Sequence, residues 1–219
     1  MTGYKLTDRQ RYTRRGEPGE TLWESGVRHE ITEAGTRLCT NEVFHFYPSA
    51  AMAAFANPIG AQIVNPRCFE VEVEDVVNRD GIKGGCKVMT RGQEVPVPVL
   101  TLEQRIEIGI RCALTVYKDP GFQSWANAWL SGEDRTAKAA ADAPSYAAYA
   151  AYAANAAADA AKAALVAAYA ANTAHAADAP AYAAYAADAA ANAAGANGNT
   201  LDVDGIIKSV LAGSEGERK

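Results

Sequence analysis

The most regular alternation of apolar and polar residues lies between Cys68 and Val77. Every second side chain is apolar and glutamates stand between them: Phe69, Val71 and Val73 against Glu70, Glu72 and Glu74. A period of two separates the two sets onto opposite faces of a strand, so the pattern predicts a half-buried strand with solvated glutamates. Residues 78–81 are typical of a turn, and residues 83–90 are predicted to return as the partner strand.

Shorter patterns on either side complete a mixed domain. Residues 23–31 contain apolar positions for one or two strands, and residues 42–47 alternate as a strand does. Residues 48–55 are predicted to form a short helix with a proline in its first turn. Residues 94–99 are extended, and their prolines predict a place at the edge of the sheet.

A longer helix is predicted to begin at Thr101, because Thr101 and Gln104 have the spacing of a capping box. Its apolar residues recur every three or four positions and form one stripe: Leu102, Ile106, Ile110, Ala113, Leu114 and Tyr117. Residues 119–121 (Asp-Pro-Gly) end this helix. The next helix carries aromatic residues at the same spacing: Phe122, Trp125 and Trp129.

Alanine then dominates the chain, with 37 alanines among the 60 residues from 137 to 196. The pattern Asp-Ala-Pro-x-Tyr-Ala-Ala-Tyr occurs at 142–149 and again at 178–185. Asp is a good helix cap and Pro is tolerated in a first turn. The repeat therefore predicts helix starts at Ala143 and Ala179.

Two different surfaces are predicted on these alanine-rich helices. An alanine face lets helix axes approach closely, either within one chain or between copies in a homo-oligomer. Its positions include Ala150, Ala157, Ala164 and Ala168. A tyrosine face offers rings and hydroxyls to a ligand. Its positions are Tyr146, Tyr149, Tyr152, Tyr182 and Tyr185.

Together these elements predict an α+β protein: a small mixed or antiparallel β domain with helices, then an alanine- and tyrosine-rich helical hairpin or bundle. We expect a flexible segment at 1–20, an α+β domain at 21–120 and an alanine-rich helical region at 121–196. A linker, a short apolar helix and a disordered tail are expected at 197–219.

Composition narrows the range of partners. The net charge of −5 argues against a nucleic-acid partner. One basic stretch is predicted to be a solvated, mobile arm: Lys5, Arg9, Arg11, Arg14 and Arg15. The alanine tract carries charged and amide side chains, so no membrane span is predicted. The four cysteines form no CxxC pair and the three histidines are scattered, which predicts reduced thiols, a cytoplasmic protein, no metal site and no cofactor.

The sequence contains none of the common nucleophile, nucleotide-binding or zinc motifs. The most pointed candidates for a binding site are His45 and Tyr47, which are two apart on a predicted strand and therefore share a face. With the helix and the glutamate strand that follow, they resemble ADP-ribosyltransferase-like folds. That resemblance implies that His45 and Tyr47 hold a nicotinamide and that a glutamate acts in catalysis, with Glu94 as a candidate. The same cleft without the chemistry would bind a nucleotide.

Several short blocks recur along the first part of the chain: YKLT at 4–7, WESGV at 23–27, LCT at 38–40, HFY at 45–47, NPI at 57–59, NPR at 65–67, KGGC at 83–86 and WANAWLSGEDR at 125–135. Together they resemble a family of tailed-phage and prophage proteins that also occurs in some bacteria. The resemblance spans residues 4–135. It implies a phage accessory protein in the cytoplasm of the bacterial host, and it transfers no activity and no residue role.

The leading hypothesis from the sequence is a non-enzymatic phage accessory protein that binds a host ligand or a host protein. In its simplest form it is a host-defence antagonist that sequesters a nucleotide signal or masks a partner. One alternative is an ADP-ribosyltransferase-like enzyme that uses a nicotinamide nucleotide. The other is a structural protein for oligomerisation or virion assembly.

Overall fold

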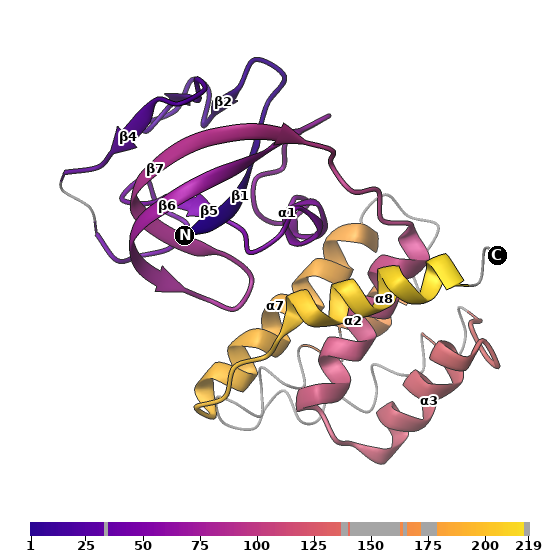
Figure 1. The fold of residues 1–219 in the computed structure, drawn as a ribbon. Coiled ribbons are helices and arrows are strands. Elements are labelled where there is room, and N and C mark those ends of the chain that lie inside the picture. Colours follow the sequence, from indigo (N-terminus) through magenta and orange to yellow (C-terminus); the bar gives the residue numbers. More distant parts are fainter. Residues whose placement is uncertain (33–34, 137–139, 141–162, 164–165, 172–178, 217–219) are drawn as a thin grey trace. The chain divides into compact units, whose positions relative to one another are not determined.

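The computed structural model describes residues 1–32, 35–136, 140, 163, 166–171 and 179–216. The chain divides into two compact units, Met1–Val99 and Leu100–Lys219, which we describe separately. The strands of the described residues lie in the first unit, and the second unit is built from helices (Figure 1). The prediction of an α+β protein is confirmed.

A long antiparallel hairpin forms the centre of the first unit. Its strands are β6 (Arg67–Arg79) and β7 (Gly84–Val95). β1 (Thr2–Thr7) pairs with β6, while β4 (Arg28–Glu30) and β5 (Phe44–Phe46) pair with different halves of β7. The register confirms the predicted alternation, because Phe69, Val71 and Val73 are buried and Glu72 and Glu74 are exposed.

The sheet closes on itself through a single bridge. The backbone N–H groups and carbonyls of Tyr4 and Tyr47 exchange hydrogen bonds of 2.9 and 2.8 Å, which joins β1 to the residue that follows β5. The ring β1-β6-β7-β5 encloses a core of apolar side chains: Trp23, Phe46, Val71, Val73, Cys86 and Met89. Phe46 fills the space beside Gly3, where an added Cβ would lie 2.8 Å from Phe46 Cδ2. A small residue is therefore required at this position.

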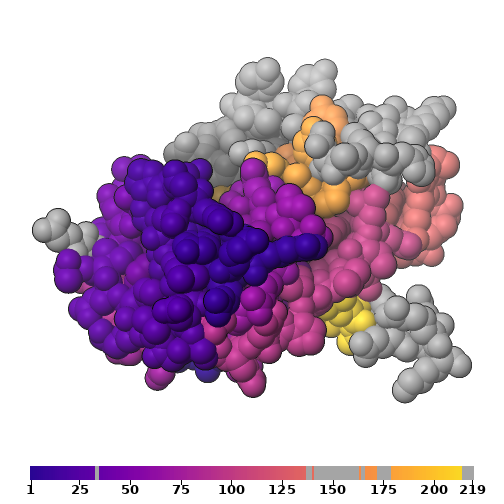
Figure 2. Space-filling view, turned by 90° about the horizontal axis from the view of Figure 1, so that it is seen from above, coloured from indigo at the N-terminus to yellow at the C-terminus, as the bar shows by residue number. Residues whose placement is uncertain are grey.

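The N-terminal residues are part of this fold, so the prediction of a flexible segment at 1–20 is wrong. Residues 2–7 form β1, and a second small sheet pairs β2 (Tyr12–Thr13) with β3 (Thr21–Leu22). The space-filling view shows these indigo residues packed into the surface of the first unit (Figure 2). The partner of β1 lies sixty to seventy residues away on β6. The polar composition of 1–20 therefore gave no sign of the pairing.

Two segments around the hairpin are confirmed as a helix and an extended segment, each with one correction. α1 (Ala50–Ala56) is capped by Ser49, whose side chain accepts a hydrogen bond from Met52 N–H, so Pro48 precedes the cap and does not lie in the first turn as predicted. The predicted edge segment at 94–99 divides differently, because Glu94 and Val95 are paired in β7 opposite β6. The prolines that follow end the strand, since they cannot donate to the ladder. Val99 is then 89% exposed.

The second unit contains α2 (Leu102–Val116), α3 (Pro120–Ser131), α7 (Ala179–Ala196) and α8 (Val203–Gly216). The capping box of Thr101 and Gln104 is present at the start of α2, as predicted. α2 packs against α7 and α8, so it belongs to the second unit. The boundary between the units thus falls at residue 99, whereas the sequence placed it at 120.

α7 shows what an alanine-rich helix does in this chain. Most of its alanines are buried. The predicted helix start at Ala179 adjoins residues 172–178, which lie outside the described residues, so it stays a prediction. Gly109 of α2 lies so close that an added Cβ would be 3.1 Å from the Ala183 carbonyl oxygen. Small residues on both helices therefore allow a close approach within one chain. Ala168 is fully buried as well.

The other predictions for the alanine region fall on Ala143, Ala150, Ala157 and Ala164, which lie outside the described residues. Assembly of copies through alanine helices stays a prediction. Within the part of the chain that the structure describes, no helix is both long enough and apolar enough to cross a membrane.

Candidate functional site

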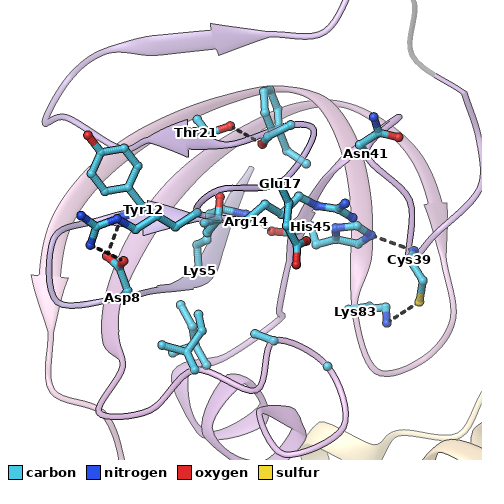
Figure 3. A pocket seen from close by; sticks show the side chains of 18 of the residues that line it. Lys5, Asp8, Tyr12, Arg14, Glu17, Thr21, Cys39, Asn41, His45 and Lys83 are labelled. Carbon is cyan, nitrogen blue, oxygen red and sulfur yellow. Dashed lines mark hydrogen bonds and ion pairs between the residues drawn. The ribbon is translucent and has the colours of Figure 1, made fainter.

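The first unit contains a cavity of about 830 Å³. Its walls come from β1, the loop that carries β2 and β3, the segment around β5, the loop after α1 and the turn before β7. Figure 3 shows the polar side chains that face one another across it. The lining holds more cations than carboxylates: Lys5, Arg14, Arg15 and Lys83 against Asp8 and Glu17. The cavity is therefore electropositive.

Lys5 is the most deeply placed of these cations. Its side chain comes from β1 and the residue is only 7% exposed. Nζ donates a 2.9 Å hydrogen bond to the His45 carbonyl oxygen and stands 4.6 Å from the centre of the Trp23 ring. Among the described residues, no carboxylate lies within 4 Å of this ammonium to balance its charge. Burial lowers the pKa of Lys5 to about 8, and the charge of Arg14 acts in the same direction.

Arg14 reaches the cavity from a loop with a strained backbone. Its φ is +53° and that of Arg11 is +72°, in the left-handed region where a residue with a Cβ costs about 1–2 kcal/mol. The loop is fixed by Asp8, whose Oδ1 accepts a 2.8 Å hydrogen bond from Tyr12 N–H, and by Thr13, which accepts a bond from Trp23 Nε1. Non-glycine residues are held in this conformation where surrounding contacts demand it, often at binding sites.

The neighbouring arginine is already compensated. Arg15 Nη1 lies 3.7 Å from an Asp8 carboxylate oxygen, and its guanidinium stands over the Tyr12 ring. Arg14 makes no comparable ion pair within the described residues. Of the two arginines, Arg14 is therefore the one whose charge remains available to a ligand.

Lys83, Cys39 and His45 form a chain of contacts at one end of the cavity (Figure 3). Lys83 Nζ lies 2.9 Å from Cys39 Sγ, and Cys39 N–H donates a 2.9 Å hydrogen bond to His45 Nε2. Burial lowers the pKa of Lys83, but the bond to Cys39 and the charges nearby outweigh it, so the pKa is raised. Lys83 is therefore an ammonium at neutral pH.

His45 is a neutral imidazole in this environment. Burial lowers its pKa to about 3, and the charges of Lys5, Lys83 and Arg14 contribute in the same direction. Because Nε2 accepts the bond from Cys39, the ring proton is on Nδ1. His45 thus offers a hydrogen-bond donor and adds no charge. Tyr47 lines the same cavity, and burial raises the pKa of its phenol.

The opposite wall is apolar. The loop after α1 contributes Ile59, Ile63 and Val64 to the lining. Asn57 holds this loop, since its amide donates to the Ile63 carbonyl at 2.9 Å and accepts from Ile63 N–H at 3.0 Å. Val64 is 82% exposed, whereas Ile59 and Ile63 are half-buried. The cavity therefore combines a cationic side with an apolar side.

The structure joins some of the predicted site residues and separates others. His45 on β5 and Tyr47, the residue that follows β5, both line the cavity, as their spacing of two in the sequence suggests. Glu94 does not, because it pairs with Arg67 outside the lining. Tyr182 and Tyr185 belong to α7 in the second unit, where Tyr182 lies 6.3 Å from Tyr169 between ring centres and Tyr185 is 46% exposed. The remaining candidates, Tyr146, Tyr149 and Tyr152, lie outside the described residues.

The sequence missed the cations that give the cavity its charge: Lys5, Arg14 and Lys83. In the sequence Lys5 and Arg14 belong to a basic stretch that predicts a mobile arm, and the structure places both in the cavity lining. Among the described residues, no three His, Cys, Asp or Glu side chains gather closely enough to hold a metal ion. The chemistry available to the cavity is the binding of an anion by two ammonium groups, a guanidinium and an imidazole N–H.

Comparison with known proteins adds no relative to this description. No protein-family model matches the chain, and neither a curated protein nor a solved structure is significantly similar to it.

Proposed function

We propose that the first unit binds a small organic anion whose phosphate meets Lys5, Arg14 and Lys83, and that the leading class of ligand is a nucleotide. The observation that carries this proposal is the buried ammonium of Lys5. It lines a cavity and has no carboxylate partner among the described residues. A buried charge is costly unless it is paired, so an anion that enters the cavity relieves that cost.

The shape and chemistry of the walls support a ligand with two different ends. A cavity of about 830 Å³ is within the size range of small-molecule sites. Arg14 and Lys83 suit a phosphate because charged donors make the stronger hydrogen bonds. Ile59 and Ile63 provide an apolar surface for a base or another flat group.

The biological role follows from the resemblance to tailed-phage and prophage proteins. An accessory protein that binds a nucleotide without converting it would remove a host signal from solution. We therefore keep the host-defence antagonist as the leading role, with sequestration of a nucleotide favoured over masking of a partner protein. The bacterial cytoplasm, where such a signal is made, is the proposed location.

The first experiment is a calorimetric titration of the full-length protein with nucleoside mono-, di- and triphosphates and with cyclic dinucleotides. Arg14→Ala and Lys83→Ala should each weaken binding about tenfold, which corresponds to one charge-assisted hydrogen bond. Arg28→Ala is the matched control, because Arg28 is exposed, pairs with Glu30 and lies outside the cavity lining. The proposal is contradicted if the unaltered protein and the three variants bind with equal affinity. It is also contradicted if the unaltered protein binds none of these anions.

One observation favours a second candidate. His45 and Tyr47 line the same cavity, as an ADP-ribosyltransferase-like site requires. One observation speaks against an enzyme: the candidate catalytic residue Glu94 forms an ion pair with Arg67 and does not line the cavity. Glu17 does line the cavity and has no ion pair among the described residues, so it would be the carboxylate available for catalysis. Release of nicotinamide from NAD that disappears in both His45→Ala and Tyr47→Phe would favour the enzyme over the binding protein.

A further inference from the structure

Two lysines line the cavity, and their surroundings differ in a way that gives them different chemistry. Lys83 Nζ donates a hydrogen bond to Cys39 Sγ at 2.9 Å and lies 4.0 Å from an Asp80 carboxylate oxygen. Among the described residues, Lys5 Nζ donates to the His45 carbonyl oxygen and faces the Trp23 ring, and it has no ion pair. The pKa of Lys83 is raised, whereas burial lowers that of Lys5 to about 8. Opposite shifts in neighbouring groups separate an electrostatic role from a reactive one.

The low pKa of Lys5 makes its amine available as a nucleophile near neutral pH. At about pH 7.5 roughly a quarter of Lys5 is neutral, compared with about one in a thousand for an ordinary lysine. The neutral form keeps its lone pair inside a cavity whose other cations can hold an anion. Apolar surroundings of this kind are how proteins activate an amine toward carbonyl compounds.

We propose that the cavity captures a phosphate-bearing aldehyde or ketone by forming an imine with Lys5 Nζ. This rests on the anion site of the proposed function, because Arg14 and Lys83 supply the contacts to the phosphate; with this ligand Lys5 meets the carbonyl carbon in place of the phosphate. The lone pair of the neutral amine forms the C–N bond while the carbonyl π pair moves to oxygen, which takes up a proton. Loss of one water from the resulting carbinolamine leaves the protonated imine. Nothing is oxidised or reduced, and no further reactant is needed.

The other residues of the cavity suit this product. The protonated imine keeps the positive charge that Lys5 carries as an ammonium, so the charge balance of the site is unchanged. Neutral His45 adds no further cation beside it. Lys83 remains an ammonium and does not compete for the carbonyl carbon.

The test uses the full-length protein and pyridoxal 5′-phosphate as the probe. The protein is incubated with a modest excess of probe at about pH 7.5 and reduced with borohydride, and the modified peptides are identified by mass spectrometry. The reduced adduct is expected on Lys5. Pyridoxal, which lacks the phosphate, should give about tenfold less adduct, and inorganic pyrophosphate should protect Lys5.

Two variants provide the controls. Lys5→Met should abolish the main adduct, whereas Lys87→Met should retain it, because Lys87 is on β7 and outside the cavity lining. Circular dichroism checks that Lys5→Met folds. If this variant does not fold, protection of Lys5 by pyrophosphate in the unaltered protein provides an independent test.

The outcomes separate this inference from the proposed function. Binding of the probe without modification of Lys5 overturns the imine and leaves anion binding intact. Equal labelling by pyridoxal, with no protection by pyrophosphate, overturns both the phosphate requirement and the proposed anion site. Labelling spread over exposed lysines with Lys5 unmodified also overturns the inference.

Discussion

Lys5 and His45 are joined by one hydrogen bond, from Lys5 Nζ to the His45 carbonyl oxygen, and burial lowers the pKa of both side chains. The two shifts affect stability in different pH ranges. His45 resists protonation down to about pH 3, and Lys5 resists it down to about pH 8. In each range the unfolded chain binds a proton that the folded chain excludes, so the free energy of unfolding falls as the pH falls.

For His45 this range lies between its ordinary pKa of 6.5 and about 3. His45 stabilises the fold fully above pH 6.5, and this contribution is lost as the pH falls toward 3. Replacing His45 with Gln keeps an acceptor for Cys39 N–H and removes the titration. Between pH 7 and 4.5 the free energy of unfolding should therefore fall about 2 kcal/mol less in the variant than in the unaltered protein. Urea titrations at both pH values measure the free energy of unfolding. An equal fall in the variant and in the unaltered protein would contradict the lowered pKa of His45.

For Lys5 the range lies between its ordinary pKa of 10.5 and about 8. Charged Lys5 destabilises the fold below this range, so Lys5→Met should gain relative to the unaltered protein as the pH is lowered from 10 to 7. The expected gain is about 2 kcal/mol. Comparing the two proteins at each pH cancels the titration of Cys68, whose pKa burial raises to about 11. A difference in free energy of unfolding that does not change with pH would contradict the assignment.

At the scale of elements, the close approach of α2 and α7 depends on small residues. Gly109→Leu should destabilise the second unit by about 1–3 kcal/mol or more, because the new side chain meets the backbone of Ala183. Gly195→Ala in α7 is the control, since nothing lies within 4 Å of its added Cβ. It should be neutral or stabilise the helix by up to about 1 kcal/mol. Thermal unfolding of both variants measures these effects. Equal melting temperatures for Gly109→Leu and Gly195→Ala would count against close packing of α2 and α7.

The same reasoning applies to Ala157→Leu and Ala164→Leu, which the alanine pattern alone predicts to overfill a helix interface. Both positions lie outside the described residues, so they stay predictions from the sequence. Ala168→Leu tests the idea at a position that the structure shows to be fully buried.

At the scale of the whole chain, the division at residue 99 predicts that residues 1–99 fold alone. This fragment contains the ring of strands and every residue that lines the cavity. It should unfold cooperatively and bind the same anion as the full chain. A fragment of residues 1–120 should add no stability to it, because the partners of α2 are α7 and α8. Circular dichroism and calorimetry compare the two, and unfolding of the shorter fragment alone would favour the boundary at 120.

Features that depend on neighbours along the chain could be predicted from the amino-acid pattern. The alternation at Phe69, Val71 and Val73 fixed a strand face, and the spacing of Thr101 and Gln104 fixed a helix start. His45 and Tyr47 entered one cavity because residues two apart on a strand share a face.

The positions of the charged side chains depend on contacts between residues far apart in the chain. Lys5 is separated by 40 residues from the carbonyl to which it donates, and Lys83 by 44 from Cys39. No periodic pattern spans such distances, so the sequence assigned Lys5 and Arg14 to a solvated arm. β1 pairs with β6, and the ring of strands closes at Tyr4 and Tyr47. These contacts place Lys5 inside the ring. A cation that composition shows only as part of a basic stretch becomes the buried charge of a binding site, because long-range pairing removes it from water.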